Sequence, residues 1–263
     1  MIECVVNISE GRHQPTIDAI ADAAGADLLD RHTDAFHNRT VLTLVGEQAP
    51  RAVATEAVDR LDLATHVGVH PRIGVVDVVP FVALDDATSA DAVDARDAFC
   101  AWAGDELAVP CFRYGTERTL PDVRRHRFAE LVPDCGPTTP HLTAGAIAVG
   151  ARDVLVAYNV WLHHASLEQA RATAGWLRRP GVRTLGLQVG DQVQISMDLT
   201  APDQVGPDVV VDAIASRHQI DRCELVGLTP RSVLNDVGPD RWGDLDLSDD
   251  STIEKRLEQR LRQ

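Results

Sequence analysis

The sequence has very little lysine and no long apolar run. Lys255 is its only lysine, and 25 basic residues stand against 40 acidic ones, a formal net charge of -15. Such a surface repels a phosphate backbone or an anionic lipid, so we expect neither nucleic acid nor membrane as a partner. No apolar run approaches the roughly 18 residues that cross a bilayer, and the N-terminus shows no basic and apolar leader.

Cysteine is also scarce, with five residues at wide, irregular spacings and no Cys-x-x-Cys pair. They are Cys4, Cys100, Cys111, Cys135 and Cys223. An odd number without close pairs argues against a disulfide framework and against a zinc cluster. We therefore expect a cytoplasmic protein that holds no metal.

The phosphate-loop, dinucleotide-binding and serine-hydrolase motifs are missing, which disfavours nucleotide binding and serine hydrolase chemistry. The composition is that of a globular protein, with 44% hydrophobic and 25% charged residues. Its 263 residues suffice for one large domain or two small ones. The acidic, lysine-poor composition fits salt adaptation and GC-rich coding alike.

The first half of the chain alternates apolar strands with amphipathic helices. The expected strands are residues 2–8, 26–33, 39–45 and 73–84, with helices after Arg12 and over 49–62. This β-α-β-β-α-β order is typical of ferredoxin-like folds. A helix over 89–107, a strand over 109–114 and a loop-rich segment over 115–145 should follow.

The second half repeats the same order. Its expected elements are strands 154–161, 182–189, 192–199 and 221–227 and helices 166–178 and 206–217. The fold class is therefore α/β (α+β), with two ferredoxin-like β-α-β-β-α-β subdomains packed around a substrate cleft. The expected domains are 1–148, 149–238 and 239–263. The last is a tail with a short amphipathic helix, opened by a capping box of Ser251 and Glu254.

Two asparagines occupy matching places in the two halves. Asn7 and Asn159 both stand near the end of the first strand of their half. If the halves pack face to face, both side chains reach the cleft. The alternative is that each asparagine caps a strand end or a turn.

The segment 65–81 concentrates the groups that carry chemistry. Gly68 and Pro71 prevent a regular helix, so His66 and His70 do not form a helical metal-ligand pair. A loop histidine instead suits general acid or base chemistry near neutral pH, although a surface histidine without a role is the alternative. Asp77 interrupts the apolar run that follows, and we interpret it as a buried structural carboxylate.

Arginines recur at the ends of strands in the first half. They are Arg12, Arg39, Arg72 and Arg113. In so acidic a chain, such a cluster would select a small carboxylate substrate. The alternative is that these arginines form salt bridges with the abundant aspartates.

Several segments together resemble one family, the formiminotransferase domain of glutamate formiminotransferase and of formiminotransferase-cyclodeaminase. The most specific of them is GVHPRIGVVDVVPF at 68–81; the others are 3–12, 37–46, 106–115, 143–152, 156–162 and 193–199. The resemblance implies two α/β subdomains with a substrate tunnel between them. It also implies a cytoplasmic homodimer that transfers a formimino group from N-formimino-L-glutamate to tetrahydrofolate, a co-substrate of one-carbon metabolism.

The resemblance assigns the catalytic role to His70, as the proton shuttle between the folate nitrogen and the leaving amine. The candidate substrate-binding residues are Asn7, His32, Asn38, Arg39, Arg72, Asn159, Trp161 and Asp198. Arg39 and Arg72 are expected near substrate carboxylates.

This chain also departs from the family pattern. His32 replaces an acid, and Trp161 and Asp198 each replace an asparagine. Because these are polar cleft positions, we expect a donor related to N-formimino-L-glutamate and with fewer carboxylates; unchanged specificity is the alternative. A second hypothesis is a divergent paralogue that binds folate or an acidic metabolite without transferring a group.

Overall fold

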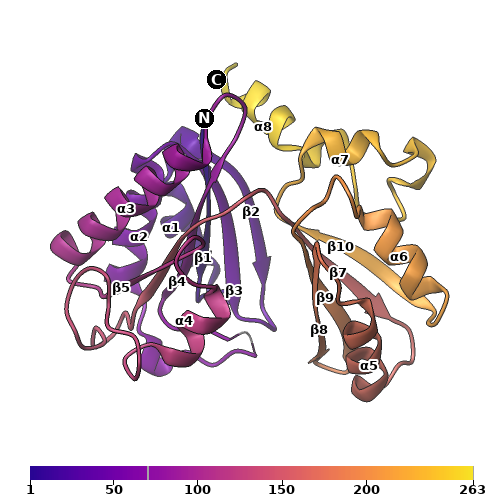
Figure 1. Cartoon of the computed structure of the whole chain (residues 1–263), viewed down its shortest axis with the longest axis horizontal. Helices are drawn as coiled ribbons and strands as arrows, with labels where there is room; N and C mark the ends of the chain where they lie inside the picture. Colours follow the sequence, from indigo (N-terminus) through magenta and orange to yellow (C-terminus); the bar gives the residue numbers. More distant parts are fainter. Residues whose placement is uncertain (70, 263) are drawn as a thin grey trace. The chain divides into compact units, whose positions relative to one another are not determined.

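The computed structural model describes residues 1–69 and 71–262, which form two compact units, Met1–Asp153 and Val154–Gln263 (Figure 1). Each unit carries its own sheet, one of six strands and one of four. The predicted mixed α/β class is thereby confirmed. The division into domains at residues 148 and 238 stays a prediction.

The sheet of the first unit has the strand order β2-β3-β1-β4-β6-β5. Its strands are β1 (Ile2–Ile8), β2 (Leu28–Asp34), β3 (Arg39–Val45), β4 (Val76–Ala83), β5 (Cys111–Tyr114) and β6 (Ile147–Ala151). β1 runs antiparallel to both β3 and β4, and β6 runs parallel to both β4 and β5. Along the chain, β1 to β4 follow the predicted β-α-β-β-α-β order. β6 and β5 extend the sheet beyond these four strands.

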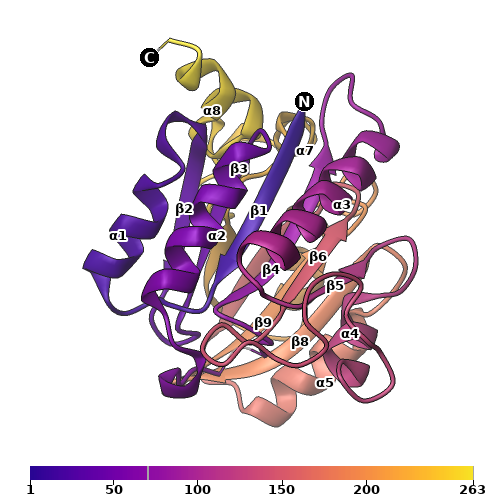
Figure 2. The same cartoon turned by 90° about the vertical axis from the view of Figure 1, so that its left-hand side faces the viewer.

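Helices cover one face of this sheet. They are α1 (Gln14–Asp22), α2 (Gln48–Arg60) and α3 (Ser89–Glu106). Val123 of α4 (Leu120–His126) instead packs with Phe112 and Ala148 on the opposite face. Figure 2 shows α1, α2 and α3 lying in front of the strands. Side chains alternate along β1, so that Cys4, Val6 and Ile8 enter the core beneath these helices. Asn7 lies on the opposite face.

The segment 115–145 is more ordered than its proline and glycine content predicts. Thr119 and Asp122 form a capping box that starts α4, with hydrogen bonds in both directions. The side chain of Arg124 on α4 then donates to Asp77 of β4 at 2.6 Å. A partly buried ion pair thus fixes a helix that the sequence pattern did not predict.

The second unit contains β7 (Val156–Leu162), α5 (Leu167–Leu177), β8 (Val182–Val189), β9 (Gln192–Leu199), α6 (Pro207–Ala215) and β10 (Ile220–Val226). The predicted element order is present. All strand pairs are antiparallel in the order β10-β7-β9-β8. Val156, Tyr158 and Val160 of β7 enter its core, so that the odd residues of β7 face the other way.

The C-terminal segment packs on this second core through Leu245 and Leu247 and carries α7 (Arg231–Asn235) and α8 (Ile253–Arg260). The expected capping box of Ser251 and Glu254 is wrong. Thr252 caps α8 by accepting from the amide of Lys255, and Glu254 accepts from the amide of Arg231 instead. The hydroxyl of Thr252, and not that of Ser251, therefore caps α8.

Within the described ranges, no helix combines the length and the apolar character that crossing a membrane requires.

Candidate functional site

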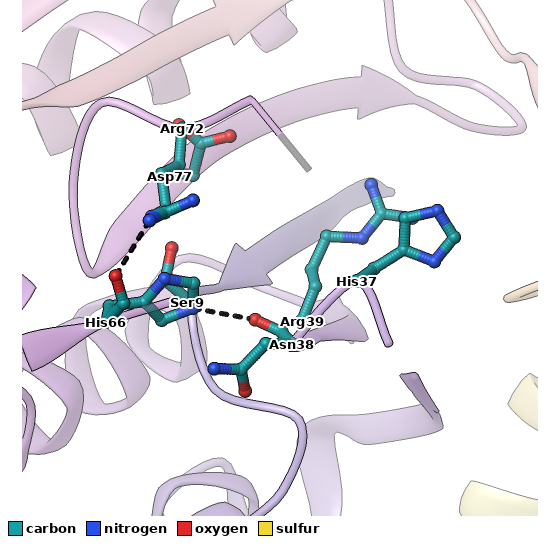
Figure 3. A pocket seen from close by; sticks show the side chains of 7 residues that line it. All are labelled: Ser9, His37, Asn38, Arg39, His66, Arg72 and Asp77. Carbon is teal, nitrogen blue, oxygen red and sulfur yellow. Dashed lines mark hydrogen bonds between the residues drawn. The ribbon is translucent and has the colours of Figure 1, made fainter. Parts of the chain in front are cut away.

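A small polar pocket lies in the first unit where three segments meet: the end of β1, the β2–β3 turn and the loop before β4. Its lining residues are Ser9, His37, Asn38, Arg39, His66, Arg72 and Asp77 (Figure 3). Asn38, Arg39 and Arg72, three of the predicted binding residues, come together here. Their neighbours Ser9 and His37 were not predicted, and His66 was considered only as one of two loop histidines.

Asn38 joins the three segments. Its Oδ1 accepts from the amide of Gly11 at 2.8 Å, and its Nδ2 donates to the carbonyl of Val67 at 3.0 Å. The residue is 7% exposed, and its backbone has a left-handed φ of 51°, which asparagine tolerates better than most residues. The first role that the geometry gives Asn38 is therefore to hold the pocket together.

Glycine allows the same segments to approach each other closely. A Cβ on Gly11 would overlap the carbonyl oxygen of Asp34 and lie 2.5 Å from the amide nitrogen of Arg39. A Cβ on Gly68 would lie 2.5 Å from the carbonyl oxygen of His37. Both positions leave no room for a larger residue, so these two glycines set the shape of the pocket.

A carboxylate orients one imidazole of the pocket. The Nδ1 of His37 lies 2.8 Å from Oδ2 of Asp34, and the backbone amides of Phe36 and His37 donate to Oδ1 of the same carboxylate. Burial alone would raise the pKa of Asp34, but the His37 ring and these amides together lower it to about 2. A carboxylate on one ring nitrogen fixes the orientation of the imidazole, as in many proton-transfer sites.

His66 provides a second imidazole with a different environment. Its Nε2 donates to the carbonyl oxygen of Asn38 at 2.9 Å, and among the described residues no partner reaches its buried Nδ1. Burial lowers the pKa of His66, against the effect of the Asn38 carbonyl. A neutral ring that donates through Nε2 carries its lone pair on Nδ1.

Arg72 and Asp77 fix the two ends of the loop before β4. The guanidinium of Arg72 donates to the carbonyls of His66 at 2.8 Å and Gly68 at 3.1 Å. Asp77, which is 2% exposed, accepts from the amide of Ile73 at 2.7 Å and from Arg124. Burial raises the pKa of Asp77, and the charge of Arg124 opposes this rise.

The structural role predicted for Asp77 is thereby confirmed. His70, the predicted catalytic residue, lies outside the described residues, but the loop segments on both sides of it are held in place.

The other predicted residues of the first unit share a face of its sheet. Asn7 and His32 both pair with Val41 of β3, so the three residues form one row, and Arg39 lies two residues further along β3 on the same side. The side-chain Nδ2 of Asn7 donates to the backbone carbonyl of Val5 at 3.2 Å. Asn7 and His32 do not line the pocket.

The predicted residues of the second unit also share one face. Asn159 and Trp161 are two residues apart on β7, so their side chains point to the same side of the sheet. Asp198 of β9 pairs with Ala157 and also points to that side. Nδ2 of Asn159 and Nε1 of Trp161 each donate to Oε2 of Glu224 at 3.0 Å. The sequence analysis missed Glu224, because the pairing of β7 with β10 brings it across from residue 159.

Arg222 completes this group of side chains. Its guanidinium carbon lies 3.9 Å from the centre of the Trp161 ring, in cation–π geometry. It projects from β10 two residues before Glu224, so both side chains fall on the same face. The indole is thus held by a carboxylate at its nitrogen and a cation on its ring.

No group of three or more histidine, cysteine or acidic side chains suited to a metal ion occurs in the described part of the chain. The pocket offers two imidazoles, two guanidinium groups and a buried carboxylate. Such a set binds anionic groups and moves protons.

Similarity to known proteins agrees with this chemistry. Residues 1–152 match the family model of the formiminotransferase domain, N-terminal subdomain. A glutamate formimidoyltransferase of Streptococcus pyogenes serotype M1 is 32% identical over 273 residues, which cover 90% of this chain and 91% of that protein. The chain belongs to the formiminotransferase family.

Other formiminotransferase relatives extend the match. A glutamate formimidoyltransferase of Thermoplasma acidophilum is also 32% identical, over 90% of both chains. A formimidoyltransferase-cyclodeaminase of Rattus norvegicus is 32% identical over 90% of this chain and 51% of its own length. The resemblance inferred from the motifs is confirmed, and the similarity extends beyond the segments where the motifs are dense.

Proposed function

We propose that this chain is a folate-dependent one-carbon transferase that moves a formimino group from N-formimino-L-glutamate, or a related donor, to tetrahydrofolate. The observation that carries the proposal is the match to glutamate formimidoyltransferases over about nine-tenths of both chains. The reaction belongs to one-carbon metabolism and to histidine catabolism, as the family resemblance implies.

The chemistry requires proton transfer, which the residues around the pocket support. Nitrogen 5 of tetrahydrofolate attacks the formimino carbon and loses a proton, and the amine of glutamate leaves only when it gains one. We assign this shuttle to His70. Its place in the motif next to Arg72 supports the assignment, since Arg72 lines the pocket with His37 and His66.

Substrate carboxylates would be bound by the cations of the same pocket. Arg39 and Arg72 are the candidates, and part of the guanidinium of Arg72 also holds the carbonyls of His66 and Gly68. Asn38 would act mainly by positioning. Asn7 and His32 would extend the binding surface along the row that they share with Val41.

The second unit would recognise the donor through Asn159, Trp161 and Asp198. The indole nitrogen of Trp161 is engaged with Glu224, so it does not replace the asparagine usual in the family as a free donor. Two carboxylates on this face, Glu224 and Asp198, disfavour an anionic substrate end. These features support a donor with fewer carboxylates than N-formimino-L-glutamate, or one that carries an amine.

Further parts of the proposal rest on the family resemblance. They are two ferredoxin-like subdomains around a substrate cleft, a cytoplasmic location and a homodimer. The β-α-β-β-α-β order in both units supports the first of these.

The decisive experiment mixes purified protein with tetrahydrofolate and N-formimino-L-glutamate and follows the release of glutamate by mass spectrometry. We expect turnover, and we expect His70→Ala to reduce it by roughly a hundredfold or more without loss of the fold. A tight folate complex without turnover, with this donor and with related formimino compounds, would instead support the non-transferring paralogue.

A further inference from the structure

Three of the five cysteines meet in the first unit, away from the pocket. Cys100 lies on α3, Cys111 begins β5, and Cys135 lies in the loop beside β5. The amide of Cys111 donates to the carbonyl of Cys135 at 3.0 Å, and the amide of Cys135 donates back at 3.4 Å. These two residues are therefore direct neighbours, as in an antiparallel strand pair.

A glycine contact brings α3 against this pair. Gly104 follows Cys100 by one helical turn, so both lie on the same side of α3. A Cβ on Gly104 would lie only 2.6 Å from the amide nitrogen of Gly136 and 3.1 Å from the carbonyl carbon of Cys135. The helix backbone thus packs directly on the loop, and the Cys100 thiol lies close enough to both other thiols for each to affect the pKa of the others.

The charges around the three sulfurs favour a single thiolate. Hydrogen bonding from Cys111, together with Cys135 and Arg113 and against the effect of burial, lowers the pKa of Cys100 to about 7. Burial raises the pKa of Cys135 to about 12, and the hydrogen bond to Cys100 raises the pKa of Cys111. The negative charge of the Cys100 thiolate is thus stabilised by two protonated thiols and by the guanidinium of Arg113. Nη2 of Arg113 lies 3.8 Å from the Cys135 sulfur.

The three cysteines of the cluster differ in exposure. Cys100 and Cys111 are fully buried, whereas Cys135 is only half-buried. A small neutral oxidant would therefore reach the thiolate past Cys135.

We propose that Cys100, Cys111 and Cys135 form a peroxide-sensitive thiol site that closes to a disulfide between Cys100 and one of its two neighbours. The Cys100 thiolate attacks a peroxide oxygen, the O–O bond breaks, and a sulfenic acid and hydroxide form. The neighbouring thiol then attacks the Cys100 sulfur and releases water. In total two thiols lose two electrons and two protons, and one hydrogen peroxide becomes two waters.

The two remaining cysteines provide internal controls. Cys223, on β10, is half-buried like Cys135, but burial raises its pKa, and the main side chains that affect it are Tyr158 and charged groups. Cys4 is fully buried, and burial and the charge of Glu3 raise its pKa well above the usual value. If exposure alone decided the rate of oxidation, Cys223 would react as fast as Cys135. The cluster hypothesis predicts instead that Cys223 is oxidised much more slowly than the cluster.

The test treats the folded full-length protein with hydrogen peroxide, blocks remaining thiols with N-ethylmaleimide and maps tryptic peptides. Cys100 and Cys111 fall in one peptide, 97–113, and Cys135 falls in another, 128–152. We expect peptide 97–113 either to escape blocking and lose the mass of two hydrogens, or to be linked to 128–152. The peptide with Cys223 should remain blocked.

Matched variants separate the cluster from general oxidation. Cys100→Ser should slow disulfide formation at least about tenfold, and Cys223→Ser should leave it unchanged. Cys111→Ala provides a second variant, in which only the Cys100–Cys135 linkage remains. Oxidation of Cys223 at the same rate as the cluster, or a disulfide that forms only in urea, would overturn the proposal. Because no cluster residue lines the pocket, this result is independent of transferase activity.

Discussion

Asp34 and His37 lie three residues apart at the β2–β3 turn, and Oδ2 of the aspartate is 2.8 Å from Nδ1 of the imidazole. The carboxylate is also held by two backbone amides, so it is a fixed partner and not a mobile surface group. The side chain of His37 is only 5% exposed and lines the pocket (Figure 3). The pair thus presents an oriented imidazole beside Arg39.

The low pKa of Asp34 predicts a pH-dependent contribution to stability. A folded pKa of about 2 lies below the ordinary value of 3.8, so the stabilisation is complete above about pH 4 and is lost as the pH falls towards 2. Asp34→Asn should lower the free energy of unfolding by roughly 2 kcal/mol at pH 6, and the difference should shrink below pH 3. Urea unfolding of both proteins at each pH measures it. A difference that does not change with pH would contradict the assignment.

Asn38→Ala should destabilise the first unit by about 3 kcal/mol. The substitution leaves the Gly11 amide and the Val67 carbonyl without their partner, and alanine is strained at a positive φ. Asn38→Gly removes the same hydrogen bonds without the backbone strain, so it should recover about 1 kcal/mol. Urea unfolding at neutral pH provides the comparison. Equal stability of the two variants would mean that the backbone conformation costs nothing here.

Gly11→Ala should disrupt the pocket, because the new methyl group meets backbone atoms of Asp34 and Arg39 that cannot move independently. We expect a loss of several kcal/mol in stability and of most transferase activity. Gly175→Ala, in the interior of α5 with open space around it, is the matched control and should stabilise by about 0.5 to 1 kcal/mol. Thermal unfolding and glutamate release are measured on both variants. An active, stable Gly11→Ala protein would show that the close approach is unnecessary.

Trp161→Asn restores the residue usual in the family and should shift donor preference towards N-formimino-L-glutamate. The amide is smaller, it cannot support the stacking of Arg222, and it opens space on the face that carries Glu224. The measurement is kcat/KM for a panel of formimino amino acids and amines, with wild type and Trp161→Phe as controls. If wild type already prefers N-formimino-L-glutamate, the altered-donor hypothesis fails.

The sequence predicted the strands well where the apolar pattern is long. Strand boundaries at 2–8, 39–45, 182–189 and 192–199 agree with the structure. β6 was missed because its five residues, Ile147–Ala151, are too few to distinguish from the glycine- and proline-rich segment before them. Its strand character depends on parallel pairing with β4 and β5, which local pattern does not encode.

The site was predicted in part for a similar reason. Motif positions pointed to Asn38, Arg39 and Arg72, which line one pocket. The pairing of His37 with Asp34 depends on the tight turn before Asn38, and the contact of Trp161 with Glu224 joins residues 63 positions apart. Contacts of this kind follow from strand register and turn geometry, and neither is visible as residue spacing.

The amide of Asn38 also couples the opening of the pocket segments. It reaches Gly11, 27 positions earlier, and Val67, 29 positions later, so either segment can detach only by breaking a bond to the same side chain. Local fluctuations that expose one segment should therefore expose the other, and their amide protons should exchange with solvent at similar rates. A small molecule that binds any one of the three segments would then slow exchange in all of them.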